Sequence, residues 1–144
     1  MISFGDDALP LMETTMPLEF LGNPPLASDR QPRPFSPAVR AGDFVYVSGQ
    51  VPANEAGEIV SGGIEAQTRQ VFVNLSKVLA LAGCTLADVC KATVWLDDAR
   101  DFGAFNRVYL EHFNGAAPAR STTEARLMID AKVEIDVVAY KPKA

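Results

Sequence analysis

A strict alternation of apolar and polar residues near the end of the chain constrains the fold more than any other feature. From Lys132 to Tyr140 every second residue is apolar, and these residues are Val133, Ile135, Val137 and Ala139. Successive side chains of a β-strand point to opposite faces of its sheet. The run therefore predicts a strand with one face against a core, while the other face carries Glu134 and Asp136.

Other extended runs and two helical patterns precede this strand. The extended runs have the composition of β-strands and cover residues 36–40, 44–50, 89–96 and 119–126. Apolar residues at the helical period predict helices over 64–82, ended by Gly83, and over 102–113, capped by Asp101. Two long helices on one face of a mixed sheet make a two-layer α+β fold.

The sheet face that the helices leave uncovered is expected to carry Tyr46, Ser48 and Trp95. In addition, the nearly continuous apolar residues over 89–96 predict a strand that is buried on both faces. The aromatic residues on the uncovered face favour its packing against another subunit. The alternative is a monomer whose outer sheet face is polar and solvated.

Length and charge limit the class of protein. The chain has 144 residues, of which 48% are hydrophobic, and its net charge of −5 argues against nucleic acid as a partner. No apolar run approaches the roughly 18 residues that a membrane span needs. The N-terminal residues lack the basic start and apolar centre of a secretory signal. We therefore expect one cytoplasmic domain with no membrane partner.

Cysteine and histidine offer little reactive chemistry. Cys84 and Cys90 do not form a C-x-x-C pair, and we expect two buried thiols rather than a disulfide. The single histidine, His112, lies late in an amphipathic helix. One histidine cannot build the usual zinc site, and this position is a poor one for the base of a Ser-His-Asp triad. We expect neither a metal nor a cofactor.

The N-terminal part of the chain differs in composition from the rest. Six prolines fall within residues 1–34, and the apolar residues there show little periodicity. This segment predicts an irregular arm over 1–33, with a short turn or strand near Leu18–Leu21. A single α+β domain would then cover residues 34–144.

Arg120 is the strongest candidate for a binding residue. It follows Pro118 at the start of a strand-like run. Its guanidinium can form two parallel hydrogen bonds with a carboxylate, which a lysine cannot do. The residue alone leaves two interpretations, which are a surface arginine at a strand end and a site for a small carboxylate. Glu134 is likewise either a solvated carboxylate or an acid–base group.

Three segments together resemble the Rid family, also called the YjgF or L-PSP endoribonuclease family. They are FVYVSGQVP at 44–52, the segment 101–113 with its Asn106, and PARS at 118–121 followed by VEI at 133–135. The resemblance covers roughly residues 34–142. It implies a chorismate-mutase-like α+β fold, a homotrimer, and ligand clefts between adjacent subunits.

The resemblance also implies an activity. Members of the family hydrolyse small 2-imino and enamino acids to 2-keto acids and ammonia, without a metal or organic cofactor. By resemblance, Arg120 would hold the substrate carboxylate and Glu134 would act on the attacking water. Ser48 and Gly49 would line the cleft, and Asn106 would lie near it.

Three positions depart from the family pattern. Phe35 stands where active members often have tyrosine, and Thr122 stands where many have cysteine. Arg33-Pro34 replaces a more usual Gly-Pro and places bulk and charge near the entrance. The sequence therefore leaves a second hypothesis, a non-catalytic trimer that binds keto acids or related metabolites. A ribonuclease is less compatible with the negative net charge.

Overall fold

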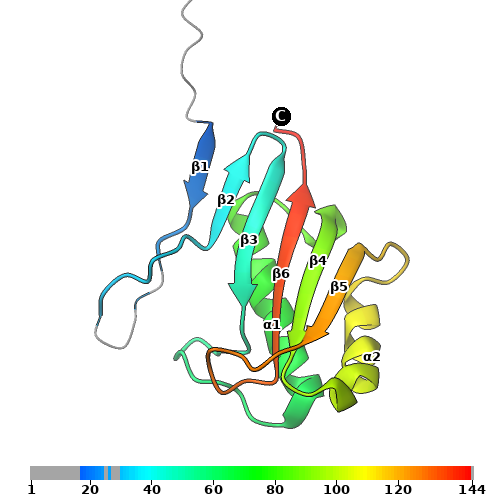
Figure 1. Cartoon of the computed structure of the whole chain (residues 1–144). Coiled ribbons are helices and arrows are strands. Elements are labelled where there is room, and N and C mark those ends of the chain that lie inside the picture. The colour runs from blue at the N-terminus through cyan, green and yellow to red at the C-terminus, as the bar shows by residue number, and fades with distance from the viewer. Residues whose placement is uncertain (1–16, 25, 27–29, 144) are drawn as a thin grey trace, which may run out of the picture.

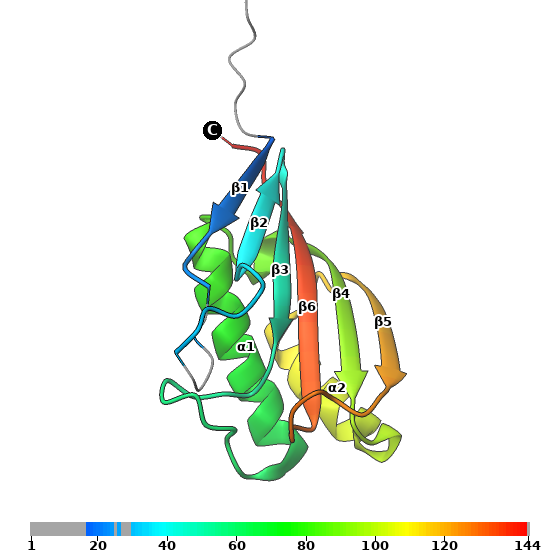
Figure 2. The same cartoon turned by 60° about the vertical axis from the view of Figure 1, so that its left-hand side comes forward.

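The computed structural model describes residues 17–24, 26 and 30–143, which form one sheet with two helices on one of its faces (Figures 1 and 2). The strands are β1 (Leu18–Leu21), β2 (Ala38–Ala41), β3 (Phe44–Gln50), β4 (Val89–Leu96), β5 (Ala119–Glu124) and β6 (Val133–Tyr140). The helices are α1 (Gly63–Leu81) and α2 (Phe102–His112). Within this part of the chain, neither helix is long and apolar enough to cross a membrane.

The six strands are arranged in the order β1-β2-β3-β6-β4-β5. Only β4 and β5 are parallel, because α2 carries the chain back to the start of the sheet between them. All other neighbours are antiparallel, including β1 and β2, which confirms a short strand at Leu18–Leu21. The two-layer α+β architecture with a mixed sheet is therefore confirmed.

The core lies between the helices and the inner face of the sheet. From α1, Val71 and Leu75 are fully buried, and the alternating residues of β6 that face the helices are buried as predicted. Burying one such side chain contributes roughly 1.5–3 kcal/mol to folding. Gly83 has a φ of 70°, a left-handed conformation that ends α1 at the predicted place.

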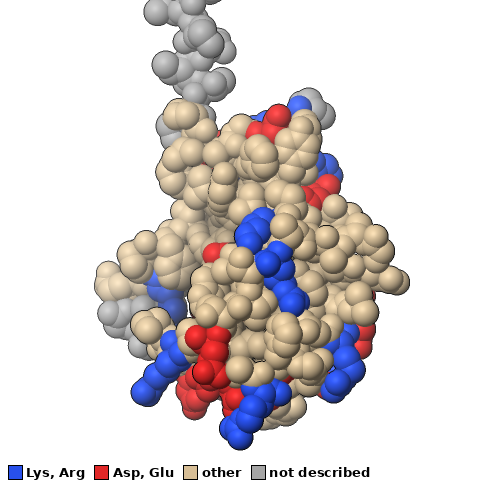
Figure 3. Space-filling model, turned by 45° about the vertical axis from the view of Figure 1, so that its right-hand side comes forward, with Lys and Arg blue, Asp and Glu red and all other residues tan. Residues whose placement is uncertain are grey.

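The outer face of the sheet is largely open in the single chain, and uncharged residues make up most of the surface seen in Figure 3. Tyr46 is 50% exposed, and the rings of Phe44 and Tyr140 pack against each other on this face, with centroids 5.2 Å apart and ring planes tilted by 58°. The residues of β4 alternate between buried and more accessible, and Cys90 is exposed. Burial of both faces of β4 and burial of Cys90 were therefore wrong predictions for one subunit, because no element of the described chain covers this face.

One local prediction about α2 also needs correction. The side chain of Asp101 makes no capping hydrogen bond. Instead, Asp98 accepts a hydrogen bond of 2.9 Å from the backbone N–H of Arg100 and caps the short 3-10 turn that leads into α2. His112 stacks on Phe72 with centroids 4.1 Å apart, so its role is one of packing.

Two amides of α1 hold the loops that follow β3 and β5. The buried Gln67 donates to the carbonyl of Val60 at 3.1 Å and accepts from the backbone N–H of Lys132 at 2.8 Å. Two helical turns further along α1, Asn74 donates to the carbonyls of Val51 and Ala53, both at 2.9 Å. Helix α1 therefore fixes two loops that are far apart in sequence.

We expect Gln67→Met to lower the free energy of unfolding by about 1–3 kcal/mol, because two buried backbone groups lose their partners. Urea denaturation of the two proteins measures this difference. Arg69→Met, at an exposed position of the same helix, is the control for helix propensity and should change stability by less than about 0.5 kcal/mol. Equal losses in both variants would show that Gln67 does not hold the loops.

Candidate functional site

A β-bulge in β3 shapes the candidate site. Val47 pairs with Val137 and Gln50 pairs with Ile135, so two residues of β3, Ser48 and Gly49, lie opposite the single residue between them on β6. A bulge of this kind breaks the alternation of side chains between the two faces. Gly49 consequently lies on the outer face of the sheet, beside Glu134.

Gly49 and Glu134 are in close contact. A Cβ atom at position 49 would lie 2.7 Å from Oε2 of Glu134 and 3.0 Å from its Cδ, so any other residue here would displace the carboxyl group. Burial raises the pKa of Glu134 above its usual value, and the charge of Asp136 raises it further. The site therefore holds a carboxyl group that takes up a proton more readily than one in water.

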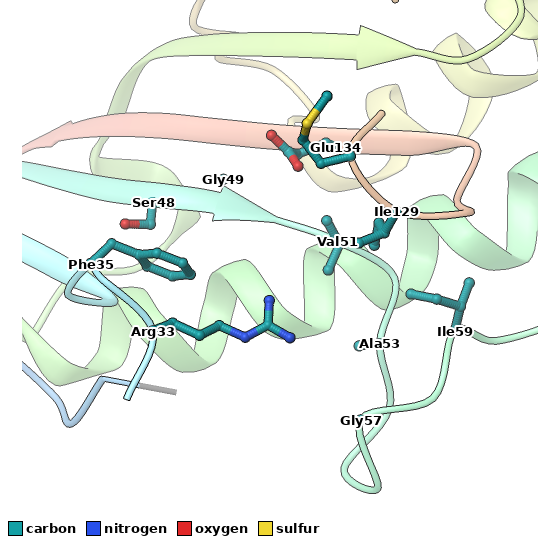
Figure 4. A pocket seen from close by; sticks show the side chains of 11 residues that line it. Arg33, Phe35, Ser48, Gly49, Val51, Ala53, Gly57, Ile59, Ile129 and Glu134 are labelled. Atoms are coloured by element: carbon teal, nitrogen blue, oxygen red, sulfur yellow. The ribbon is translucent and has the colours of Figure 1, made fainter. Parts of the chain in front are cut away.

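Glu134 forms one wall of a cavity of about 490 Å³. Figure 4 shows that the loop after β3 and the loop before β6 form the opposite walls. Apart from Arg33 and Glu134, the lining side chains carry no charge; these are Phe35, Ser48, Gly49, Val51, Ala53, Gly57, Ile59, Met128 and Ile129. A small number of polar groups on mainly apolar walls is typical of a small-molecule site.

Ser48 connects the bulge to the segment that carries Phe35. Its hydroxyl donates to the carbonyl of Ser36 at 2.6 Å, and its backbone N–H donates to the carbonyl of Pro37 at 3.0 Å. The hydroxyl proton of Ser48 is thus committed to a backbone carbonyl. Ser48 lines the cavity, but its hydroxyl donates to the backbone next to Phe35 and offers no free proton to a ligand.

Arg120 lies elsewhere, on the edge strand β5, and its guanidinium packs against α2. The guanidinium carbon is 4.6 Å from the ring centroid of Tyr109 and 5.6 Å from those of Phe102 and Phe105. A cation over aromatic faces is stabilised by their negative electrostatic potential. Among the described residues, no carboxylate lies within 4.0 Å of this guanidinium. Arg120 is therefore a cation without an anionic partner.

Within the described part of the chain, two buried hydroxyls on the same side of the sheet make no hydrogen bond of ordinary geometry. They belong to Tyr109 and to Thr122, which is two residues beyond Arg120 on β5. Burial raises the pKa of Tyr109, and the nearby Arg120 opposes this rise. The sequence analysis interpreted the aromatic residues of α2 only as core and did not single out Tyr109 as a candidate site residue. The available signal was a tyrosine among phenylalanines, because a buried tyrosine hydroxyl usually has a hydrogen-bond partner. Asn106 lies on the same helix.

The predicted site residues therefore form two groups within one chain. Phe35, Ser48, Gly49 and Glu134 surround one cavity. The other group, Arg120, Asn106 and Thr122, lies on β5 and α2. Arg120 pairs with Ala92 on the inner face, whereas Glu134 pairs with Trp95 on the outer face. One chain thus does not bring Arg120 and Glu134 together.

Known proteins resemble this chain over most of its length. Residues 28–141 match the sequence profile described as Endoribonuclease L-PSP. A RutC family protein of Pyrococcus horikoshii is 46% identical over 110 residues, which are 75% of this chain and 87% of that protein. A mouse protein named 2-iminobutanoate/2-iminopropanoate deaminase is 39% identical over 110 residues, which are 75% and 82% of the two chains.

Solved structures have the same architecture. Yeast Mmf1 superposes with a TM-score of 0.78 and 34% identity, covering 86% of this chain and 98% of that one. Escherichia coli TdcF with bound serine superposes with a TM-score of 0.75 and 31% identity, covering 85% and 98%. The arrangement of a mixed sheet and two helices is therefore shared with these proteins.

We expect Gly49→Ala to fold but to push the Glu134 carboxyl out of its place, because the added carbon would overlap it. The free energy of unfolding should fall by less than about 1 kcal/mol, because the end of a flexible side chain can move aside, and a crystal structure of the variant should show the displaced side chain. Gly103→Ala is the matched control, because a Cβ there meets nothing within 4 Å. An unmoved Glu134 in Gly49→Ala would contradict the prediction.

The raised pKa of Glu134 predicts a pH-dependent stability difference. A carboxyl whose pKa is raised by folding favours the folded state at low pH, and this contribution is lost as the pH rises through its folded pKa. Glu134→Gln removes the titration, so the variant should gain stability relative to the native protein as the pH rises from 4.5, the ordinary pKa of a glutamate, through the raised pKa of the folded state. Urea denaturation across this range measures it, with Glu58→Gln as an exposed control. A difference that is constant with pH would contradict the prediction.

Proposed function

Because the chain belongs to the endoribonuclease L-PSP family, as its motifs predicted, we propose that it hydrolyses small 2-imino acids and their enamines to 2-keto acids and ammonia. The observation that carries this proposal is the half-buried carboxyl of Glu134, held against the Gly49 bulge in a cavity with mainly apolar walls. The name of the mouse relative supports the substrate class.

We further propose that the protein is a homotrimer and that Arg120 of one subunit completes the cavity of the next. Two observations support this arrangement. The open sheet face carries exposed aromatic rings, which favour burial against another subunit. In addition, Arg120 has no anionic partner among the residues that the structure describes, while the cavity that contains Glu134 is lined by no residue of β5. The Glu134 cavity would gain a cation for the substrate carboxylate, and Arg120 would gain an anionic partner.

In the proposed reaction, Arg120 binds the substrate carboxylate through two parallel hydrogen bonds and thereby positions the adjacent imine carbon. A water molecule adds to this carbon while Glu134 accepts its proton. This proton passes to nitrogen and gives an amino group on the carbon that carries the new hydroxyl. The hydroxyl then gives its proton to the same nitrogen, the carbon–nitrogen bond breaks, and ammonia leaves as the carbonyl forms. One water is consumed, one ammonia is released, and nothing is oxidised or reduced.

The environment of Glu134 fits the role of a general base. Burial disfavours its charged form, so the carboxylate is a stronger base than one in water and binds the transferred proton more firmly. Asp136 adds to this effect by repulsion. The apolar walls, which include Val51 and Ile129, limit the water that competes for the proton.

A second candidate function is binding of keto acids without catalysis. The observation that favours it is the shortage of proton donors in the cavity. Phe35 has no hydroxyl, and the hydroxyl of Ser48 is already bonded to the carbonyl of Ser36. This candidate predicts a measurable dissociation constant for a 2-keto acid together with no acceleration of imine hydrolysis.

We expect Arg120→Ala to abolish the acceleration of imine decay, because the substrate carboxylate loses its only proposed cationic partner. The imine is produced by an amino-acid oxidase, and semicarbazide traps what remains. Arg107→Ala is the control: Arg107 lies on α2 and pairs with Glu65 at the surface, so its loss should leave the rate within about twofold. Equal decay with native protein, Arg120→Ala and no protein would refute catalysis and leave the binding function.

A subunit-mixing experiment tests whether the site is shared. Arg120→Ala and Glu134→Gln should each be inactive alone, but trimers refolded from an equal mixture should regain activity at about a quarter of their sites. Those are the sites that combine Arg120 from one variant with Glu134 from the other. If the mixture stays inactive while native subunits refolded in the same way recover, the two residues do not meet across an interface.

A further inference from the structure

The cavity is lined by one cation that the proposed reaction does not use. Arg33 lines the cavity, and Figure 4 shows its guanidinium pointing into the space between Phe35 and Val51. Among the described residues, no hydrogen bond or ion pair involves this guanidinium; the recorded ion pairs use other lysines and arginines. Arg33 is therefore positioned to bind an anion that enters from outside.

The backbone around Arg33 is constrained. Pro32 and Pro34 flank it, and each proline ring fixes its own φ. The residue before a proline is also restricted to extended conformations. In addition, the carbonyl of Arg33 accepts a hydrogen bond of 2.9 Å from the backbone N–H of Phe35, and Pro32 bridges to Leu26. These restraints fix where the Arg33 side chain leaves the backbone, at the mouth of the cavity.

The cavity offers more room and more positive charge than a small monocarboxylate requires. Its volume of about 490 Å³ falls within the range of sites for drug-sized ligands. Arg33 and Phe35 also line an adjoining hollow of about 360 Å³. Glu134, the other charged group of the lining, is shifted toward its neutral form. If Arg120 holds the carboxylate next to the reacting carbon, Arg33 remains free for a second anionic group.

We propose that Arg33 is a specificity-determining residue that selects substrates with a second carboxylate, namely imines derived from acidic amino acids. This inference rests on the proposed function for the reaction itself. The preference for a dicarboxylate, however, is a property of binding and can be measured without turnover. Two parallel hydrogen bonds between the Arg33 guanidinium and the distal carboxylate would give rise to this preference.

Calorimetric titration with two keto acids of equal chain length tests the inference. 2-Oxoglutarate has a distal carboxylate where 2-oxopentanoate has a methyl group. We expect the native protein to bind 2-oxoglutarate about tenfold more tightly, since a charged hydrogen-bonded pair accounts for a ratio of this size. Arg33→Gln should remove the preference and leave 2-oxopentanoate binding within about twofold. Arg69→Gln, on the surface of α1, makes the same change in charge and should leave the preference for 2-oxoglutarate intact.

Several outcomes would overturn the inference. They are an equal or opposite preference in the native protein, an equal weakening of both ligands by Arg33→Gln, and no measurable binding of 2-oxoglutarate. The imine assay with glutamate and norvaline as precursors separates this inference from the proposed function. A binding preference without acceleration of either imine refutes catalysis and leaves the role of Arg33. Acceleration of both imines at equal rates, without a binding preference, refutes the role of Arg33 alone.

Discussion

The contact between Gly49 and Glu134 depends on one extra residue in β3, and the candidate site depends on this contact. The bulge at Ser48 and Gly49 turns the glycine toward the outer face, where only a hydrogen atom fits beside the carboxyl group. Gln50 donates to the carbonyl of Ser48 at 3.0 Å and helps to hold the bulge. Without the bulge, the side chains of β3 would keep alternating between the two faces, and Gly49 would not lie beside Glu134.

The site that we propose has two halves that differ in electrostatics. In one half, burial and a neighbouring carboxylate disfavour the charged form of Glu134. In the other half, Arg120 rests against three aromatic rings, near the buried hydroxyl of Tyr109. A carboxylate ligand would satisfy the cation, and a reacting water would use the base. Because the sheet separates the two groups, the assembly of subunits becomes part of the chemistry we propose.

Sequence patterns predicted the elements well where a single periodicity governed them. β3 and β4 begin and end at the predicted residues, and α1 and α2 lie within one residue of their predicted bounds. Predictions failed where the outcome depended on a neighbour. Cys90 is exposed because nothing in the described chain covers the outer face of β4, and Asp98 rather than Asp101 caps the turn before α2. Apolar composition alone does not say which surface will be covered.

The sequence by itself determined the family, the order of the elements, and the identity of Arg120 and Glu134 as the residues to examine. Their chemistry is carried by side-chain type and by motifs that are local in the chain. Only the tertiary structure decided that these two residues face opposite sides of one sheet, that Gly49 rather than Ser48 contacts Glu134, and that Arg33 points into the same cavity. Register, bulges and burial arise from contacts between distant segments, and no local pattern encodes them.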